Sequence, residues 1–402
     1  MKREGRNPAH FHASILSMMK DEGPFLLEWL AYHQHIGFNQ VSVYTNKCND
    51  GTDDMLRRLE EMGLARHYRN DVPAGKKPQP HALGLATANP DVRDTDWLIV
   101  MDADEFLSVK LKQGRITDLI DALPRATDGI ALTWRYFGSS GLTDWNPGLV
   151  TENYTHAAPD SFHKGWGVKT LFRPFEHMRL GIHRPHVKSA GGKPELAQLL
   201  QDQNWVNGSG KALDKTFNTS GWRSTEQSLG YAWAEMNHYG VKSREAYLLR
   251  QIRGNVNNKA DKYNAAYFSI FDRNEIDAPN IQRQLPKVKA TIAQWLEDPR
   301  LRKLQDEALD YHRTQVAQLR SAPEYNGLIA QLNQAGDIPI DRLNEVLYIQ
   351  HMPPAAQDKV RKLQASGMPD RDIALMVEAA IKRYVANQGT QAGEDGSEAR
   401  ET

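Results

Sequence analysis

In the first seventy residues, short apolar runs alternate with segments of helical periodicity. Ala13–Met18, Gln40–Thr45 and Leu64–Tyr68 have the length and composition of strands. Asp54–Met62 reads as a helix between the second and third of them. An earlier helix is predicted by residues at helical spacing between Pro24 and Gly37, namely Phe25, Leu26, Trp29, Leu30 and His33. Strands that alternate with helices predict an α/β fold, with a mostly parallel sheet covered on both faces.

A buried strand that ends in acids is the most informative segment. Trp97–Met101 is apolar and has the length of a strand, and Asp102, Asp104 and Glu105 follow it. In open α/β sheets, ligands bind at the carboxyl ends of the strands. Asp102 and Asp104 are two positions apart, so their side chains point the same way along an extended segment. Two carboxylates that face one point suit a hard divalent cation that keeps positions open for phosphate oxygens.

Part of this pattern also fits a plain turn or a phosphatase. The strand could end in a polar turn in which Asp102 caps a helix. The acids could also be the Asp-x-Asp motif of a phosphatase, whose first Asp is a nucleophile. Such a motif usually has Thr or Val two places after its second Asp, where this chain has Phe106. It also tends to open its domain, whereas about a hundred residues come first here.

The pattern changes near residue 278. Ile281–Ala322 reads as mostly helix, interrupted at Pro299, and residues 337–350 and 357–387 read the same way. We therefore expect a catalytic domain over residues 1–277 and a helical extension over 278–388. Residues 389–402 are small and charged, which predicts a disordered tail. The extension carries no catalytic pattern, so we expect it to pack as an appendage or to support homo-oligomerisation.

Composition narrows the class of protein. The 50 Lys and Arg residues balance the 50 Asp and Glu residues, so no nucleic-acid surface is predicted. One cysteine excludes an internal disulfide and suits a reducing compartment. Met1–His12 is too polar for a signal peptide, and no apolar run approaches the ~20 residues that span a bilayer. We expect a cytoplasmic protein, peripheral at the inner membrane face if its acceptor is lipid-linked.

Several blocks of the sequence resemble a GT-A glycosyltransferase of the family 2 type, close to the branch shared with family 92. In chain order the blocks are Lys20–His33 with Gly37 behind it, Asn49–Asp54, Asp96–Phe106, Trp134–Ser140 and Asn237–Gly254. Their order and spacing are more specific than any single block. The resemblance implies a Rossmann-like GT-A fold. It also implies sugar transfer, with inversion, from a nucleotide-diphosphate donor (UDP being the commonest) to a glycan, polysaccharide or lipid-linked acceptor.

The resemblance also implies a metal site. A bound Mn²⁺ or Mg²⁺ would stabilise the charge on the leaving diphosphate as a Lewis acid. Asp104 would coordinate it directly, and Asp102 would act through water or contact the ribose. GT-A enzymes often complete the site late in the chain, and His238 matches that block. Imidazole together with carboxylates suits Mn²⁺ better than Ca²⁺. The main rivals to His238 are His183 and His186.

The remaining assignments concern donor and acceptor. The expected nucleotide-sugar contacts are Glu22, Asn46, Asp50, His81, Asp102 and Lys242, with Arg253 as a further cation for phosphate. Asn49–Asp54 is also an ordinary turn before a helix cap, and Lys242 and Arg253 border an amphipathic helix that could simply face solvent. For the general base that deprotonates an acceptor, the candidates are Asp144 and Glu226. The Glu-Asp pair usual in family 2 is not evident, so the stereochemistry stays open.

Three residues could stack on sugar faces, although core packing is the commoner role for tryptophan: Trp145, Trp166 and Trp222. Two other functions use the same acids. One is a hydrolase of a phosphate ester or glycoside, for which two acids would flank the substrate about 5–10 Å apart. The other is a silent relative that only binds a nucleotide or glycan.

Overall fold

The computed structural model describes residues 11–187, 194–253, 263–343, 354–368, 373 and 376. The chain divides into two compact units, the first ending at Leu332 and the second beginning at Asn333. In the second unit, α14 (Pro354–Ala365) carries Val360, which packs in a small apolar cluster with Ile373. Within the described part of the chain, no helix is long and apolar enough to cross a membrane.

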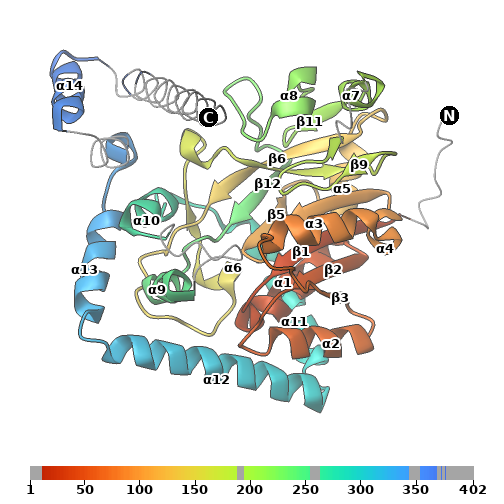
Figure 1. Ribbon diagram of the computed structural model, residues 1–402, viewed down its shortest axis with the longest axis horizontal. Coiled ribbons are helices and arrows are strands. Elements are labelled where there is room, and N and C mark those ends of the chain that lie inside the picture. The colour runs from red at the N-terminus through yellow and green to blue at the C-terminus, as the bar shows by residue number, and fades with distance from the viewer. Residues whose placement is uncertain are drawn as a thin grey trace, which may run out of the picture. The chain divides into compact units, whose positions relative to one another are not determined.

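The first unit is built on a sheet of nine strands in the order β3-β2-β1-β4-β8-β6-β12-β5, with β11 paired to β6 (Figure 1). The strands are β1 (Ala13–Met19), β2 (Gln40–Thr45), β3 (Arg66–Arg69), β4 (Trp97–Met101), β5 (Glu105–Val109), β6 (Gly129–Tyr136), β8 (Val168–Phe172), β11 (Trp205–Asn207) and β12 (Ala234–His238). Strands β1 to β4 are parallel to one another, and β6 is parallel to β12 and β11. Only β8 and β5 run against their neighbours. The predicted α/β fold with a mostly parallel sheet is confirmed.

Two groups of helices cover opposite faces of the sheet (Figure 1). Neighbouring residues of β1 point to opposite faces, so Ile15 joins one core cluster and Leu16 the other. The cluster around Ile15 includes residues of α1 (Gly23–Ile36), α2 (Thr52–Glu61), α11 (Leu285–Trp295) and α12 (Pro299–Ser321). The cluster around Leu16 includes residues of α3 (Pro78–Ala88) and α4 (Pro90–Arg93).

The other described elements are shorter or lie at the margins. The helices are α5 (Ile116–Ala122), α6 (Val150–Asn153), η2 (His163–Gly165), α7 (Pro194–Gln201), α8 (Lys215–Ser220), α9 (Arg244–Arg253), α10 (Ala265–Phe271), η3 (Pro279–Gln284), α13 (Tyr325–Gly336) and η4 (Ile340–Arg342). The strands are β7 (His156–Ala157), β9 (Met178–Arg179), β10 (His186–Val187) and β13 (Ile276–Asp277).

Helix α1 anchors the start of β5. Pro24 occupies its first turn and Gly37 ends it with a left-handed backbone, φ 111°. The Trp29 indole donates to the carbonyl oxygen of Glu105 at 2.9 Å, and the Tyr32 hydroxyl donates to that of Leu107 at 2.7 Å. Both aromatic side chains are buried. The helix therefore fixes the backbone that directly follows the acidic strand end.

The first two predicted strands and the strand before the acids are confirmed to within a residue, whereas the third begins later than expected. Gly63 has φ 74° and the Leu64 amide donates to the Leu59 carbonyl at 2.8 Å, so residue 64 still belongs to the end of α2. The strand β3 consequently starts at Arg66. The helix break expected at Pro299 is confirmed, because α12 begins there.

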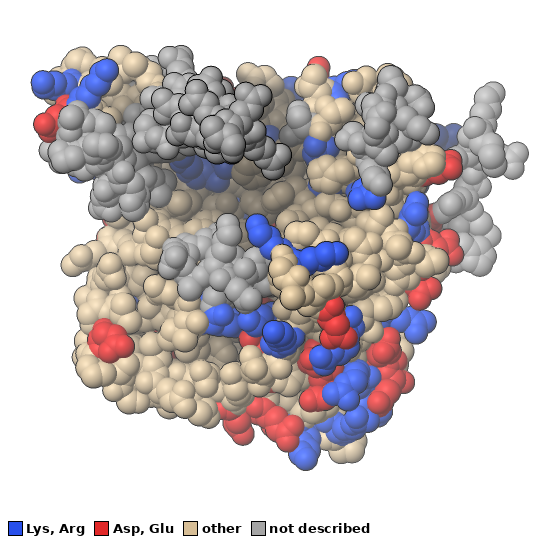
Figure 2. Space-filling view, in the orientation of Figure 1, with Lys and Arg blue, Asp and Glu red and all other residues tan. Residues whose placement is uncertain are grey.

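The first compact unit extends beyond residue 277, where we expected a domain to end. Helices α11 and α12 pack on α1, and α12 also packs on α2. The guanidinium of Arg58 on α2 binds the carboxylate of Asp298, which also caps α12 through the Leu301 amide at 2.8 Å. In Figure 2, basic and acidic side chains are interspersed over α2 and the adjoining end of α12. These helices are part of the core rather than an appendage.

This packing predicts that α12 contributes to the stability of the sheet domain. Leu301 is fully buried, so Leu301→Ala should lower the free energy of unfolding by about 2–5 kcal/mol. Lys303→Ala is the matched control, because that side chain is 76% exposed and should change stability by less than about 0.5 kcal/mol. Chemical denaturation followed by tryptophan fluorescence measures both. A main transition unchanged by Leu301→Ala would mean that α12 is a separate appendage.

Candidate active site

The candidate site lies along one edge of the sheet, where the carboxyl ends of parallel strands meet. β4 leads into Asp102 and Asp104, β12 ends at His238, and β1 leads into Asp21 and Glu22. These strands run in the same direction, since β8 is antiparallel to both β4 and β6 and β12 is parallel to β6. Residues far apart in sequence are thereby brought to one edge, as expected for ligand sites in α/β sheets.

Asp104 is a buried carboxylate that contacts two residues from much later in the sequence. Its Oδ2 accepts a hydrogen bond from Nη1 of Arg250 at 2.7 Å, and its Oδ1 lies 3.6 Å from Nε2 of His238. Burial alone would raise the pKa of Asp104, but the charge of Arg250 and the contact with His238 hold it well below its ordinary value. Asp104 is therefore ionised at neutral pH.

His238 is oriented by the aromatic residues around it. Its ring centroid lies 5.0 Å from that of Trp134 and 5.3 Å from that of Tyr136, both on β6. Nδ1 is buried and has no hydrogen-bond partner among the described residues, while Nε2 faces Asp104. Ligand atoms 3.6 Å apart can both reach one cation placed between them through bonds of about 2.1 Å. Asp104 and His238 therefore fit a divalent metal as two of its ligands.

Asp102 turns to a different cation. Lys169 is fully buried on β8, and its Nζ lies 3.1 Å from Oδ2 of Asp102 and 3.2 Å from Oε2 of Glu105. The backbone after β4 forms a turn, closed by the Glu105 amide on the Asp102 carbonyl at 3.1 Å. The expectation that Asp102 and Asp104 face one point assumed an extended segment, and this turn overturns it. Among the described residues, no three His, Cys, Asp or Glu side chains gather closely enough to hold a metal by themselves.

Glu105 stabilises the turn through three contacts of its carboxyl group. Its carboxylate accepts hydrogen bonds from the Trp134 indole at 2.8 Å and from the Asp102 amide at 2.9 Å, in addition to its contact with Lys169. Burial raises the pKa of Glu105 to about 8, although Lys169 opposes that shift. Burial would lower the pKa of Lys169, but Asp102 and Glu105 raise it overall, so Lys169 is charged.

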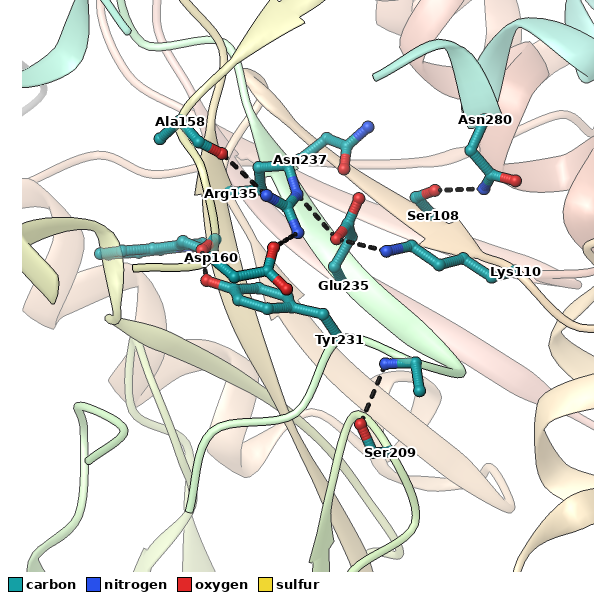
Figure 3. Close-up of polar contacts among 12 residues, drawn as sticks. Ser108, Lys110, Arg135, Ala158, Asp160, Ser209, Tyr231, Glu235, Asn237 and Asn280 are labelled. Atoms are coloured by element: carbon teal, nitrogen blue, oxygen red, sulfur yellow. Dashed lines mark hydrogen bonds and ion pairs between the residues drawn. The ribbon is translucent and has the colours of Figure 1, made fainter. Parts of the chain in front are cut away.

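A second buried ion network ties together the three strands beside the site (Figure 3). Arg135 of β6 donates to Glu235 of β12 at 2.8 Å, and Lys110, just after β5, donates to the same carboxylate oxygen at 2.8 Å. Arg135 also binds Asp160 at 2.6 Å and lies 4.4 Å from the centre of the Tyr231 ring. Each charge is paired within this network, which links β6, β12 and the residue that follows β5.

A cavity of about 280 Å³ is lined by Arg250, the residue that binds Asp104, and we call it the cation pocket. Its basic residues are Lys20, Lys242, Arg250 and Arg253, and its acidic residues are Asp21, Glu22 and Asp50. Lys242 has φ 58°, and its Nζ lies 4.6 Å from the centre of the Phe25 ring. Burial lowers the pKa of Lys242, while Glu22 and Asp104 oppose the shift. Arg253 binds Glu22 at 3.1 Å. Such a concentration of cations favours a phosphate ligand.

A larger cavity of about 690 Å³ lies between α3 and residues 179–186, and we call it the α3 cavity. His183, His186 and Trp222 line it. The Trp222 side chain is 46% exposed. The centre of the His183 ring lies 5.4 Å from that of Trp134, whose ring also contacts His238. His183 and His186 thus line the α3 cavity rather than contacting Asp104.

The predicted nucleotide contacts fall into two groups. Glu22, Asp50 and Lys242 line the cation pocket, whereas Asn46 and His81 are not among its lining residues. The His81 Nδ1 instead pairs with the Asn70 side chain at 2.6 Å.

The carboxylate of Asp50 is occupied by backbone and side-chain donors. It accepts from the Gly23 amide at 2.7 Å, from the Thr52 amide at 3.0 Å and from the Thr52 hydroxyl at 2.6 Å. Asp50 therefore links the first turns of α1 and α2, which agrees with the view of that loop as a turn before a helix cap.

The two candidate bases lie on exposed loops. Asp144 is 77% exposed and pairs with Arg320 of α12 at 3.1 Å, and Glu226 is exposed in the loop that follows α8. Among the three tryptophans, Trp145 lies 4.4 Å from the His312 ring and Trp166 donates to the Asp160 carbonyl at 2.9 Å. Only Trp222 of the three lines one of the two cavities.

Arg250 and Lys169 are the site residues that sequence reasoning did not assign. A lysine within the apolar run 168–172 was a visible signal, because an unpaired lysine is rarely buried. Arg250 had no comparable signal. It is one of several basic residues on the amphipathic helix α9, and the sequence does not show which of them points toward the sheet.

The model of glycosyltransferase family 92 matches residues 17–204. A family 92 protein of Ricinus communis is 27% identical over 150 residues, covering 35% of this chain and 25% of that protein. One of Arabidopsis thaliana is 23% identical over 215 residues, covering 50% and 36%. The chain thus spans about a quarter to a third of the length of these relatives. The match includes Asp102, Asp104 and Lys169, whereas His238 and Arg250 lie beyond it.

Solved structures resemble the chain more distantly. Residues 1–349 of TarS from S. aureus, in complex with UDP, are 12% identical, with 93% of this chain and 92% of that chain covered and a TM-score of 0.31. Glucosyl-3-phosphoglycerate synthase from Mycobacterium tuberculosis, with Mn²⁺, UDP and glucosyl-3-phosphoglycerate, is 13% identical over 33% of this chain and 50% of that chain, with a TM-score of 0.22. At these TM-scores the structures are only distantly similar to this chain. The similarity to family 92 rests on the sequence match and agrees with the sheet described above.

The contacts of Lys169 with Asp102 and Glu105 predict that the effect of losing Lys169 on stability depends on pH. With its pKa at about 8 in the folded protein and about 4.3 in the unfolded chain, Glu105 binds more protons when folded, so wild-type stability falls as pH rises between these values. Lys169→Met should raise the pKa of Glu105 further, so the variant should continue to lose stability above pH 8. We expect a loss of about 3–5 kcal/mol at pH 9 and a smaller loss at pH 6.

Denaturant unfolding at the two pH values measures this difference. The matched control is Lys169→Met combined with Glu105→Gln, which removes the titrating group and should lose the dependence on pH. An equal loss for Lys169→Met at pH 6 and pH 9 would show that Lys169 does not compensate Glu105.

Proposed function

We propose that this chain, a relative of glycosyltransferase family 92, transfers a sugar from a nucleotide-diphosphate donor to a glycan, polysaccharide or lipid-linked acceptor. The observation that carries the proposal is the contact of Asp104 with His238 and Arg250. Arg250 lies 146 positions from Asp104 in the sequence. A carboxylate, an imidazole and a guanidinium at a strand end, beside a pocket rich in cations, form a site suited to a metal–diphosphate ligand.

The donor would lie across the cation pocket. Its diphosphate would contact Lys242 and Arg250. Their positive charges would stabilise the negative charge that develops as the sugar–phosphate bond breaks. Its nucleoside would extend toward the loops after β1 and β2, where Asp21 and Asn49 line the same pocket. We propose UDP as the nucleotide. Asn46, His81 and Asp102 stay predicted contacts of the ribose or the sugar.

The site also fits a divalent metal, for which we propose Mn²⁺ or Mg²⁺. Asp104 Oδ1 and His238 Nε2 would hold it, with diphosphate and water oxygens as further ligands, and it would supply Lewis-acid stabilisation of the leaving group. Arg250 already binds Oδ2 of Asp104, so the carboxylate can serve both cations through different oxygens. Asp102, held by Lys169, is better placed for an indirect role.

The acceptor would approach from the α3 cavity. Trp222 offers an exposed aromatic face to a sugar ring, and the cavity residue His183 is linked to His238 through contacts of both rings with Trp134. Inverting transfer needs a general base, and Asp144 and Glu226 stay the proposed candidates, although their exposed loops lend them little support. A glycosidase has less support than a transferase, because Asp102 and Asp104 are each bound to a cation instead of facing each other across a gap.

The direct test of the proposal is hydrolysis of nucleotide sugars by the full chain. We expect UDP-sugars to be turned over slowly without acceptor in the presence of Mn²⁺, and UDP with Mn²⁺ to raise the melting temperature, since a ligand that binds only the folded state stabilises it. Glycosidase and phosphatase substrates should not react. A protein that UDP stabilises but that turns over no nucleotide sugar would instead be a silent binding relative.

His238→Ala tests the metal assignment. Loss of one ligand should raise the Mn²⁺ concentration needed for half-maximal UDP-sugar hydrolysis at least tenfold, and excess Mn²⁺ should restore part of the rate. His183→Ala is the matched control, because His183 also contacts Trp134 but lines the α3 cavity. If the Mn²⁺ dependence of His238→Ala matches that of the wild type, His238 has only a packing role.

A further inference from the structure

Helix α12 packs closely against the loop that begins α1. A Cβ atom placed on Gly23 would lie 2.9 Å from the Cβ of Ala308 on α12 and 3.0 Å from Oδ2 of Asp50. Both distances are below those of ordinary contacts, so only glycine fits while α12 occupies this position. The same Asp50 oxygen accepts the Gly23 amide at 2.7 Å. Helix α12 therefore packs directly against the loops that follow β1 and β2.

Three residues near the middle of α12 face the cation pocket. Tyr311, His312 and Gln315 line it, and Tyr311 and Gln315 are four positions apart, which places them on one face of the helix. The His312 ring lies 5.9 Å from that of Phe25 and 4.4 Å from that of Trp145. These contacts hold the middle of α12 against α1 and leave Tyr311 and Gln315 beside the pocket.

The pocket holds both acids and cations near α12. Asp21 and Asp50 are close enough to Tyr311 to raise the pKa of its hydroxyl together with burial, which comes first, whereas Lys242 and Arg253 help to lower the pKa of His312, again after burial. Arg253 also binds Glu22 at 3.1 Å, so acids and cations of the pocket lie next to each other beside the middle of α12. At about 280 Å³ the pocket is at the small end for ligand sites, so it suits a nucleoside and part of a diphosphate rather than a whole nucleotide sugar.

We propose that α12 forms one wall of the nucleoside site and selects the nucleotide. Tyr311 packs on the base, and the Gln315 amide, which can both donate and accept, binds its polar edge. The proposal rests on the proposed function and deepens it, because it makes residues 311–315 a determinant of donor specificity. The packing of α12 on the sheet domain brings these residues to the pocket.

Paired titrations of the full chain with UDP and with inorganic pyrophosphate, each with Mn²⁺, test this wall. Tyr311→Ala and Gln315→Ala should weaken UDP binding at least tenfold and leave pyrophosphate binding within twofold, because pyrophosphate has no base to contact these side chains. Gln315→Ala should also narrow the preference for UDP over GDP and ADP. Arg313→Ala is the matched control, since that side chain is on the same helix and 53% exposed, and both ligands should bind it as they bind the wild type.

The outcomes separate the two proposals. Wild-type protein that binds neither a nucleoside diphosphate nor pyrophosphate overturns the proposed function and the wall together. Wild-type binding of UDP with unchanged affinity in Tyr311→Ala and Gln315→Ala overturns the wall alone. Equal weakening of UDP and pyrophosphate also overturns it, because α12 would then only support the fold. Tyr311→Phe keeps the packing of the ring, so native-like affinity there with loss in Tyr311→Ala supports packing on the base.

Discussion

A buried lysine fixes the geometry of the acidic strand end. Lys169 has no exposed side-chain surface, and both of its carboxylate partners, Asp102 and Glu105, come from the turn after β4. Burying a charge is costly unless it is paired, so opening the turn would leave the Lys169 ammonium without its carboxyl partners. Asp102 is directed to Lys169, whereas Asp104 contacts His238 and Arg250, which come much later in the sequence.

Buried side chains on both sides of the turn hold the neighbouring site residues in place. The Trp134 indole donates to Glu105, and the same ring packs against both His238 and His183. On the other side, Trp29 and Tyr32 of α1 donate to carbonyl oxygens at the start of β5. The positions of the metal ligands proposed here therefore depend on the packing of buried side chains rather than on loops. Such support is what precise placement of catalytic groups requires.

Much of the fold followed from local patterns, and much of the site did not. The strand Trp97–Met101 and the first helix were predictable because apolar spacing and the Pro and Gly at the helix ends act locally. The roles of Asp102 and Asp104 were harder, because their direction depends on a turn stabilised by Lys169 from another strand. Arg250 was hidden by its neighbours on α9, and the place of α12 depended on contacts with Gly23 and Phe25 that no local pattern encodes. Long-range pairing of charges, not propensity, decides these features.

The most direct measurement is a crystal structure of the full chain with UDP and Mn²⁺, with anomalous scattering to locate the metal. The account predicts a single manganese peak between Oδ1 of Asp104 and Nε2 of His238, the diphosphate against Arg250 and Lys242, and the nucleoside in the cation pocket. A nucleotide bound in the α3 cavity, or manganese bound away from Asp104, would contradict it.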